Sequence, residues 1–187
     1  MTKSELRKIY KQKRQALSTE TIFDLSLQIA NNLLELPIWE FSYYHIFLSI
    51  TEQKEINTDY ILSILSGKDK HIIVSKSDFT TNDLTHFLLT DSMVIKKNKY
   101  NIPEPAEGIP IDNKLIDVVF IPLLAFDKQG HRVGYGKGFY DTFLSKCKPE
   151  TIKIGLSFFE AESEIEGVFE NDVPLDYCVT PTKTYRF

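Results

Sequence analysis

The chain has 187 residues and a formal net charge of -4, with 42% hydrophobic and 26% charged residues. This length suits one domain with a full hydrophobic core, so residues 1–187 are predicted to form a single domain. The negative charge argues against broad binding to nucleic acid or to anionic membranes, and no run of 18 apolar residues could span a bilayer.

The two cysteines, Cys147 and Cys178, are far apart and lack metal-ligand spacing, which predicts free thiols in a reducing compartment. No apolar stretch follows the basic start of the chain, so no signal peptide is predicted. We therefore expect a cytoplasmic protein, and we expect it to be a monomer.

The chain begins with two predicted helices. Residues 2–17 lack Gly and Pro and place apolar side chains at helical spacing. Ser18 is a predicted N-cap for a second helix from Thr19 to about Leu36, with Pro37 beyond its end.

The first helix carries basic residues at steps of four, four and three, namely Lys3, Arg7, Lys11 and Arg14. This spacing stacks them on one flank, where like charges repel by roughly 0.2–0.5 kcal/mol per pair. The ordinary interpretation is a solvated basic face. The alternative is that these side chains share a bound anion.

Beyond the second helix, short apolar runs alternate with one helical segment. Strands are predicted at residues 43–50, 71–74, 84–89, 117–122, 152–158 and 177–180, and a helix at 57–65. This alternation predicts an α/β fold with a mostly parallel, Rossmann-like sheet in three layers, with helices on both faces. His45, His71 and His86 lie in these strands and are predicted to be structural.

Residues 101–110 contain three prolines and are predicted to form a stiff loop, because Pro is excluded from regular helices and central strands. The loop is either a rigid connection or the wall of a pocket. Composition does not separate the two.

Four of the eight glycines fall within nine residues, namely Gly130, Gly134, Gly136 and Gly138. They follow the predicted strand at 117–122 and precede a predicted helix at 138–146, an order that directs free N–H groups at a phosphate. The letters match neither the Walker A motif nor the dinucleotide fingerprint. The loop is therefore a phosphate-site candidate of another kind, or a surface turn without a ligand.

Residues 157–182 contain seven carboxylates and no Lys or Arg. Such a run is usually a solvated face. If the fold brings one of these carboxylates beside the glycine loop, it would help Asp141 to hold a divalent cation. Asp172 is the best placed by its local turn sequence.

Three blocks of the sequence resemble one known family. They are Lys3 to Arg7 (KSELR), Asn101 to Pro105 (NIPEP), and Phe126 to Asp141 (FDKQGHRVGYGKGFYD). In this order and at these separations they are similar to 5-formyltetrahydrofolate cyclo-ligases, also called methenyltetrahydrofolate synthetases. The resemblance covers nearly the whole chain, which is identified as one cyclo-ligase domain.

The resemblance implies an activity and its partners. The family converts 5-formyltetrahydrofolate to 5,10-methenyltetrahydrofolate and splits ATP into ADP and phosphate, with Mg²⁺ as the metal. It implies that ATP phosphorylates the formyl oxygen, so that this oxygen departs as phosphate when the ring closes. The expected ligands are thus 5-formyltetrahydrofolate and MgATP.

The resemblance also assigns residues to sites. The implied ATP-binding residues are Lys3, Ser4, Glu5, Leu6, Arg7, Arg14, Arg132, Val133, Gly134, Tyr135, Gly136, Lys137, Gly138, Phe139 and Tyr140. The implied substrate-binding residues are Ile50, Glu55, Tyr100, Tyr135, Gly136, Lys137, Gly138 and Phe139, and the implied Mg²⁺ ligands are Asp141 and Asp172.

The chain departs from common family patterns at four loop positions. Many relatives have Leu at Val133 and Tyr at Phe139, the position of Tyr135 is variable, and many bacterial relatives have Gly at Lys137. Lys137 either touches phosphate or points to solvent.

Two other classes of function compete with this interpretation. One is an ATP-dependent small-molecule kinase on the same scaffold, and the other is a non-catalytic nucleotide- or folate-binding module. The kinase has no use for Glu55 and the proline-rich loop, and the binding module would tolerate the loss of Asp141 or Asp172.

Overall fold

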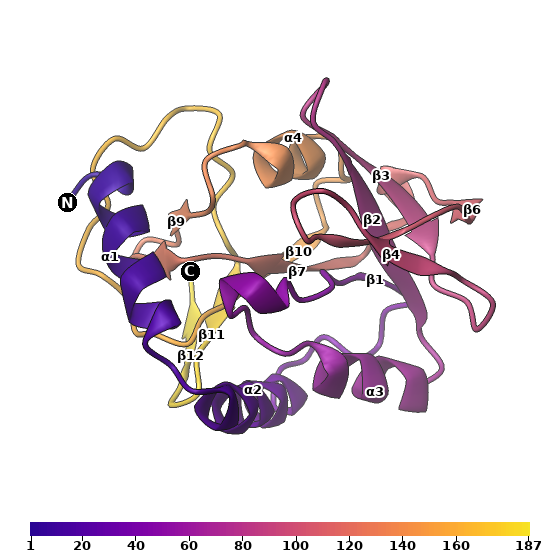
Figure 1. Cartoon of the computed structure of the whole chain (residues 1–187), viewed down its shortest axis with the longest axis horizontal. Helices are drawn as coiled ribbons and strands as arrows, with labels where there is room; N and C mark the ends of the chain where they lie inside the picture. The colour runs from indigo at the N-terminus through magenta and orange to yellow at the C-terminus, as the bar shows by residue number, and fades with distance from the viewer.

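In the computed structural model, which describes all 187 residues, a large sheet forms the centre of the molecule (Figure 1). Its strand order is β12-β11-β10-β7-β1-β2-β3-β6. The strands are β1 (Tyr43–His45), β2 (His71–Asp78), β3 (Asp83–Leu88), β6 (Ile109–Pro110), β7 (Val118–Pro122), β10 (Ile152–Leu156), β11 (Tyr177–Val179) and β12 (Thr184–Arg186). The five strands from β11 to β2 are parallel, and each of the three outer strands pairs with its inner neighbour in antiparallel fashion. The predicted mostly parallel α/β sheet is confirmed.

Helices cover both faces of the sheet (Figure 1). Helices α2 (Thr19–Leu34) and α3 (Asp59–Gly67) lie on one face, where Ile29, Leu33 and Leu65 share the largest apolar cluster with strand residues such as Phe120. Helix α4 (Phe139–Ser145) covers the other face through Phe143 and Leu144. The predicted placement of helices on both faces is therefore confirmed.

Helix α1 (Lys3–Gln15) lies beside β8 (Ala125–Phe126) and β9 (Arg132–Val133), which pair in a separate two-stranded sheet. Leu6 and Tyr10 pack there on Leu124, Ala125 and Val133. This contact fixes the basic flank of α1 beside the chain that enters the glycine loop.

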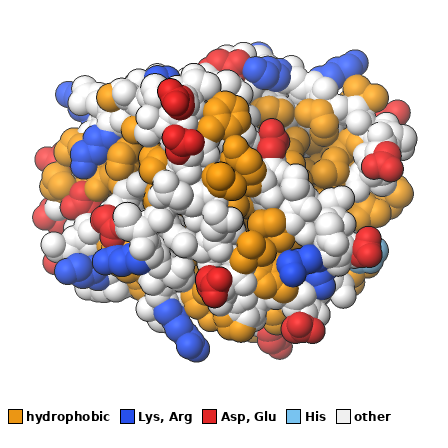
Figure 2. All heavy atoms as spheres, turned by 90° about the horizontal axis from the view of Figure 1, so that it is seen from below, with side chains coloured by type: hydrophobic (Ala, Val, Ile, Leu, Met, Phe, Trp, Pro, Cys, Tyr) orange, Lys and Arg blue, Asp and Glu red, His pale blue; other side chains and the backbone are white.

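The outer side of α2 and α3 mixes apolar and charged side chains (Figure 2). Phe23, Leu27 and Leu34 of α2 are each close to half exposed there. None of the helices is long and apolar enough to cross a membrane.

One strand prediction and one loop prediction need correction. The strand expected at residues 43–50 ends at His45, because the chain then bends so that the Ser49 hydroxyl donates to the Ile56 carbonyl at 2.6 Å. The proline-rich segment contains β5 (Pro103–Pro105) and β6, two short edge strands, rather than loop alone. Proline is tolerated at an edge because an edge strand leaves N–H positions unpaired.

The prediction placed the glycine loop directly between the strand β7 and the helix α4. In the structure, the hairpin of β8 and β9 also lies in this connection, between β7 and the glycine loop. A second two-stranded sheet pairs β4 (Ile95–Lys97) with β5 in antiparallel fashion, and the short 3-10 helices η1 (Thr51–Gln53) and η2 (Asn113–Leu115) complete the fold.

Candidate active site

The basic flank of α1 faces the glycine loop and the acidic stretch. A capping box fixes the first turn, because the Glu5 carboxylate accepts from Thr2 N at 2.8 Å and Thr2 Oγ1 accepts from Glu5 N at 3.3 Å. Lys3 pairs with Asp172, and Arg7 Nε donates to the Gly134 carbonyl at 3.0 Å. The flank is therefore not a freely solvated face.

The glycine loop passes close to Arg7. A Cβ built on Gly136 would lie 3.2 Å from Cζ and Nε of Arg7, and Gly136 has φ +94. Gly138 adopts φ +75 as the N-cap of α4. Glycine is favoured at both positions because residues with side chains rarely adopt a left-handed backbone. Lys137, between them, is exposed.

Glu55 is held at the end of the η1 turn and is only 5% exposed. Its Oε2 accepts from Ile50 N at 2.8 Å, which brings two predicted substrate residues together. Lys54 has φ 49, a left-handed conformation that turns the chain before Glu55. A buried carboxylate of this kind needs polar partners.

Tyr135 supplies the second partner of Glu55 and joins the two halves of the site. Its hydroxyl donates to Glu55 Oε1 at 2.7 Å and accepts from Arg14 Nη2. Lys11 Nζ lies 5.7 Å from the centre of the Tyr135 ring. The glycine loop, α1 and the η1 turn therefore meet at one phenol.

Burial is the largest cause of the pKa shifts of Glu55 and Tyr135. It raises the pKa of Glu55, while the Ile50 N–H, the Arg14 charge and the Tyr135 hydroxyl oppose that rise. Burial and the nearby Glu55 charge raise the pKa of Tyr135, so the phenol keeps its proton and acts as a donor.

Arg14 is 5% exposed, and its Nε has no hydrogen-bond partner. A buried guanidinium N–H without a partner is rare in folded proteins and points to a ligand or water. A cavity of about 10 Å³, roughly the room for one water, lies beside Arg14 and Glu55.

The two predicted metal ligands lie close together. Asp141 Oδ1 accepts from Val173 N at 3.0 Å, one residue beyond Asp172, and also pairs with Arg132 Nη2 at 2.6 Å. Asp172 Oδ2 pairs with Lys3 and accepts from Phe169 N at 2.6 Å. The other oxygen of each carboxylate has no partner in the chain. No group of three or more His, Cys, Asp or Glu side chains is placed to hold a metal ion.

Asp127 organises the hairpin before the loop and was not predicted. It is fully buried, and its carboxylate accepts from Gln129 N, His131 N and Ile165 N at 2.9 to 3.0 Å. These bonds tie the β8–β9 turn to the acidic stretch. The residue sequence D-K-Q-G is a turn signal that could have indicated this role.

An aromatic group links Tyr100 to the glycine loop. The rings of Tyr100 and Phe79 have centroids 4.4 Å apart, and those of Phe79 and Phe139 are 5.1 Å apart. Tyr100 is 48% exposed, which leaves room for a ligand on its ring. Phe79 was not predicted; its one signal is an aromatic residue among the polar residues of the β2–β3 turn.

Five of the residues predicted to bind ATP either pack within the fold or make no side-chain hydrogen bond. Leu6 is fully buried in the core and the Glu5 side chain caps α1. Val133 is fully buried against α1, and Ser4 is exposed without a side-chain hydrogen bond. Tyr140 packs its ring 6.0 Å from that of His45.

The glycine loop, the cationic flank of α1 and the buried Glu55 carboxylate meet at one place in this α/β fold, and the first two are typical of proteins that bind a phosphorylated ligand. The chain belongs to the 5-formyltetrahydrofolate cyclo-ligase family, whose sequence profile matches residues 1–181.

Individual relatives agree with this assignment. The mouse 5-formyltetrahydrofolate cyclo-ligase is 32% identical over 93% of this chain and 91% of its own length. The Escherichia coli K12 protein of the same name is 28% identical over 95% of this chain and 99% of its own length. The structure of 5,10-methenyltetrahydrofolate synthetase from Aquifex aeolicus is similar with a TM-score of 0.84, at 29% identity, over 100% of this chain and 93% of that one.

Proposed function

We propose that this protein converts 5-formyltetrahydrofolate to 5,10-methenyltetrahydrofolate at the expense of ATP and with Mg²⁺. The observation that carries the proposal is the bridge made by Tyr135. One glycine-loop side chain joins Arg14 of the cationic flank to Glu55. A reaction that transfers a phosphoryl group to a folate needs both ligands at one place.

The phosphate side of the proposed site consists of Lys3, Arg7, Arg14 and the glycine loop. Arg7 reaches the Gly134 carbonyl, and the buried Nε of Arg14 has no partner within the chain. These cations would neutralise the charge of the transferring γ-phosphate. ATP binding at these residues is part of the proposal.

The folate side of the proposed site consists of Glu55, Ile50 and the aromatic group with Tyr100. A carboxylate accepts hydrogen bonds from pterin N–H groups, and both oxygens of Glu55 are engaged within the chain. Because Glu55 is only 5% exposed, the Tyr135 hydroxyl would have to move away from Glu55 Oε1 to let the pterin reach this carboxylate.

The proposed reaction proceeds in three steps. The formyl oxygen attacks the γ-phosphorus of ATP, the bond to the β-phosphate oxygen breaks, and ADP leaves. Nitrogen 10 then adds to the formyl carbon and loses its proton. Finally the carbon–oxygen bond breaks, phosphate departs with the former formyl oxygen, and the methenyl bridge remains. The chain contributes position and charge.

The residues present fit a shared magnesium site. Asp141 and Asp172 each keep one carboxylate oxygen without a partner in the chain, and their side chains are 33% and 22% exposed. Two carboxylates with ATP phosphates and waters satisfy the preference of Mg²⁺ for oxygen ligands. When bound, Mg²⁺ would offset charge on the phosphates.

The test follows absorbance in the methenyl-folate band with purified protein. A rise that requires 5-formyltetrahydrofolate, Mg²⁺ and ATP together is the expected result. Folded protein that binds ATP but gives no rise would contradict the proposal and favour a kinase or a binding module. The variant Asp141→Asn is expected to fold normally and to lose Mg²⁺-dependent turnover.

A further inference from the structure

Side chains of the β4–β5 hairpin contact the η1 turn at one end and lead to the glycine loop at the other. At one end, Lys97 Nζ lies 2.6 Å from Glu52 Oε1 of η1, three residues before Glu55. At the other end, Tyr100 contacts Phe79, which contacts Phe139 at the start of α4. The hairpin thus runs along one side of the proposed folate site.

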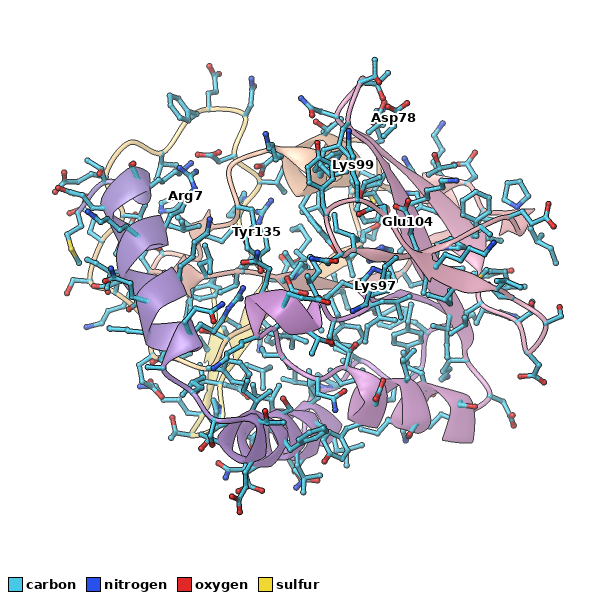
Figure 3. The ribbon with its side chains drawn as sticks, viewed as in Figure 1. Arg7, Asp78, Lys97, Lys99, Glu104 and Tyr135 are labelled. Atoms are coloured by element: carbon cyan, nitrogen blue, oxygen red, sulfur yellow. The ribbon has the colours of Figure 1, made fainter.

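This hairpin is cationic on the side of the site. Lys97 is half exposed, and Lys99 Nζ lies 5.1 Å from the centre of the Tyr100 ring. In Figure 3, Tyr135 lies between Arg7 on one side and Lys97 and Lys99 on the other. These two lysines are separate from the cations of α1, which the proposed function assigns to phosphate.

The chemistry of the proposed substrate matches this arrangement. Beyond its pterin, 5-formyltetrahydrofolate carries an aromatic p-aminobenzoyl ring and then a glutamate with two carboxylates. An exposed tyrosine ring can stack on the first, and two ammonium groups can pair with the second. Because Lys97 pairs with Glu52, three residues before Glu55, a substrate with its pterin at Glu55 would have its tail within reach of the hairpin.

We propose that Tyr100 and Phe79 hold the p-aminobenzoyl ring and that Lys97 and Lys99 bind the glutamate carboxylates. This inference rests on the proposed function. Tyr100 was predicted to bind the substrate; the proposal adds Phe79, Lys97 and Lys99 and gives the substrate tail its own site.

Lys97 is free to change partners. Its ion pair with Glu52 joins two exposed side chains, 49% and 42% accessible, and such pairs contribute little to stability. A substrate carboxylate would compete with Glu52 for the same ammonium group. Removal of the Glu52 charge should therefore strengthen tail binding.

Lys96 provides a matched control on the same strand. It pairs in register with Glu104, whose carboxylate accepts from Ser77 N of β2 at 3.3 Å. Since side chains alternate along a strand, Lys96 points to the β2 side and Lys97 to the opposite side. Removal of Lys96 therefore takes one positive charge from the hairpin, as removal of Lys97 does, but from the opposite face.

The test compares 5-formyltetrahydrofolate with 5-formyltetrahydropteroate, which lacks the glutamate. In Lys97→Ala/Lys99→Ala, KM for the folate should rise about tenfold, while KM for the pteroate stays within about twofold. Lys96→Ala should change neither KM, and Glu52→Gln should lower KM for the folate by about twofold. The KM for ATP should be unaffected throughout.

Three results would overturn the inference: equal KM values for the two substrates in the unaltered protein, an equal rise for both in the double variant, or an effect of Lys96→Ala as large as that of the double variant. Absence of turnover with either substrate contradicts the proposed function instead. The tail site is then tested by calorimetric binding of the two compounds to the same variants, where equal affinities overturn it.

Discussion

Arg7 links the first helix to the glycine loop through one side chain. Its Nε bonds to the Gly134 carbonyl, and its guanidinium lies against Gly136. In the proposed site it also contacts a phosphate. We predict that Arg7→Ala raises KM for ATP by about tenfold or more, because a charge-assisted hydrogen bond of about 1.5–3 kcal/mol is lost. Steady-state kinetics with varied ATP measures the change.

Lys8 is the matched control for Arg7, because it is the next residue on the same helix and is exposed. Lys8→Ala should leave KM for ATP unchanged. If Arg7→Ala behaved like Lys8→Ala, the assignment of the basic flank to phosphate would be wrong.

Tyr135 satisfies Glu55 and Arg14 in the absence of substrate. Tyr135→Phe removes the hydroxyl, so the two buried partners lose a hydrogen bond and stability should fall by about 1–3 kcal/mol. The same change removes competition for Glu55 Oε1, so KM for 5-formyltetrahydrofolate should fall. Urea unfolding and kinetics measure the two effects. A higher KM at unchanged stability would contradict the competition.

At the level of elements, the glycine loop depends on the backbone of particular glycines. Gly136→Ala places a Cβ 3.2 Å from the Arg7 guanidinium at a residue with φ +94. The loop must therefore shift, and we predict a several-fold rise in KM for ATP. Gly134→Ala is the control, since a Cβ there meets nothing within 4 Å. Equal effects of the two changes would contradict this explanation.

Elements with strong local signals were predicted well. Ser18 caps α2 by accepting from Thr21 N at 3.1 Å, and β7 is the predicted buried strand. The early end of β1 and the two edge strands of the proline-rich segment were not predicted, because pairing with distant strands decides them. The β8–β9 hairpin was missed because its strands have only two residues each.

Only the parts of the candidate site that have a local sequence signal were predicted. The spacing of basic residues on α1 and the glycine cluster are local patterns, and the structure brings Arg7 to Gly134. Phe79 and Lys97 belong to turns and edges without a motif, so only the tertiary fold shows that they lie near predicted residues. Residue roles that came from the family resemblance remain predictions.

At the scale of the whole molecule, two buried histidines make stability depend on pH. Ser75 Oγ lies 2.6 Å from His45 Nε2 and 2.9 Å from His86 Nδ1. Burial lowers the pKa of His86 from 6.5 to about 4, and burial together with His86 lowers that of His45 well below 6.5. Both are therefore neutral in the folded protein at neutral pH.

The sign of the effect follows from linkage. Above the unfolded pKa near 6.5 both states are neutral and the full stability is present; as pH falls toward 4, only the unfolded chain takes up the proton, so stability is lost. Between about pH 7.5 and about pH 5, His86 should account for a loss of about 2 kcal/mol. Urea unfolding at the two pH values should show that His86→Gln loses about 2 kcal/mol less stability over this range than the unaltered protein. An equal loss in both proteins would contradict this origin.

The most direct test of the proposed reaction follows the formyl oxygen. If ATP phosphorylates that oxygen, 5-formyltetrahydrofolate labelled with oxygen-18 in its formyl group should transfer the label to the inorganic phosphate released during turnover. Mass spectrometry of that phosphate measures the transfer. Label in one oxygen of each phosphate is the predicted result, and unlabelled phosphate from a reaction that forms the methenyl product would contradict the account.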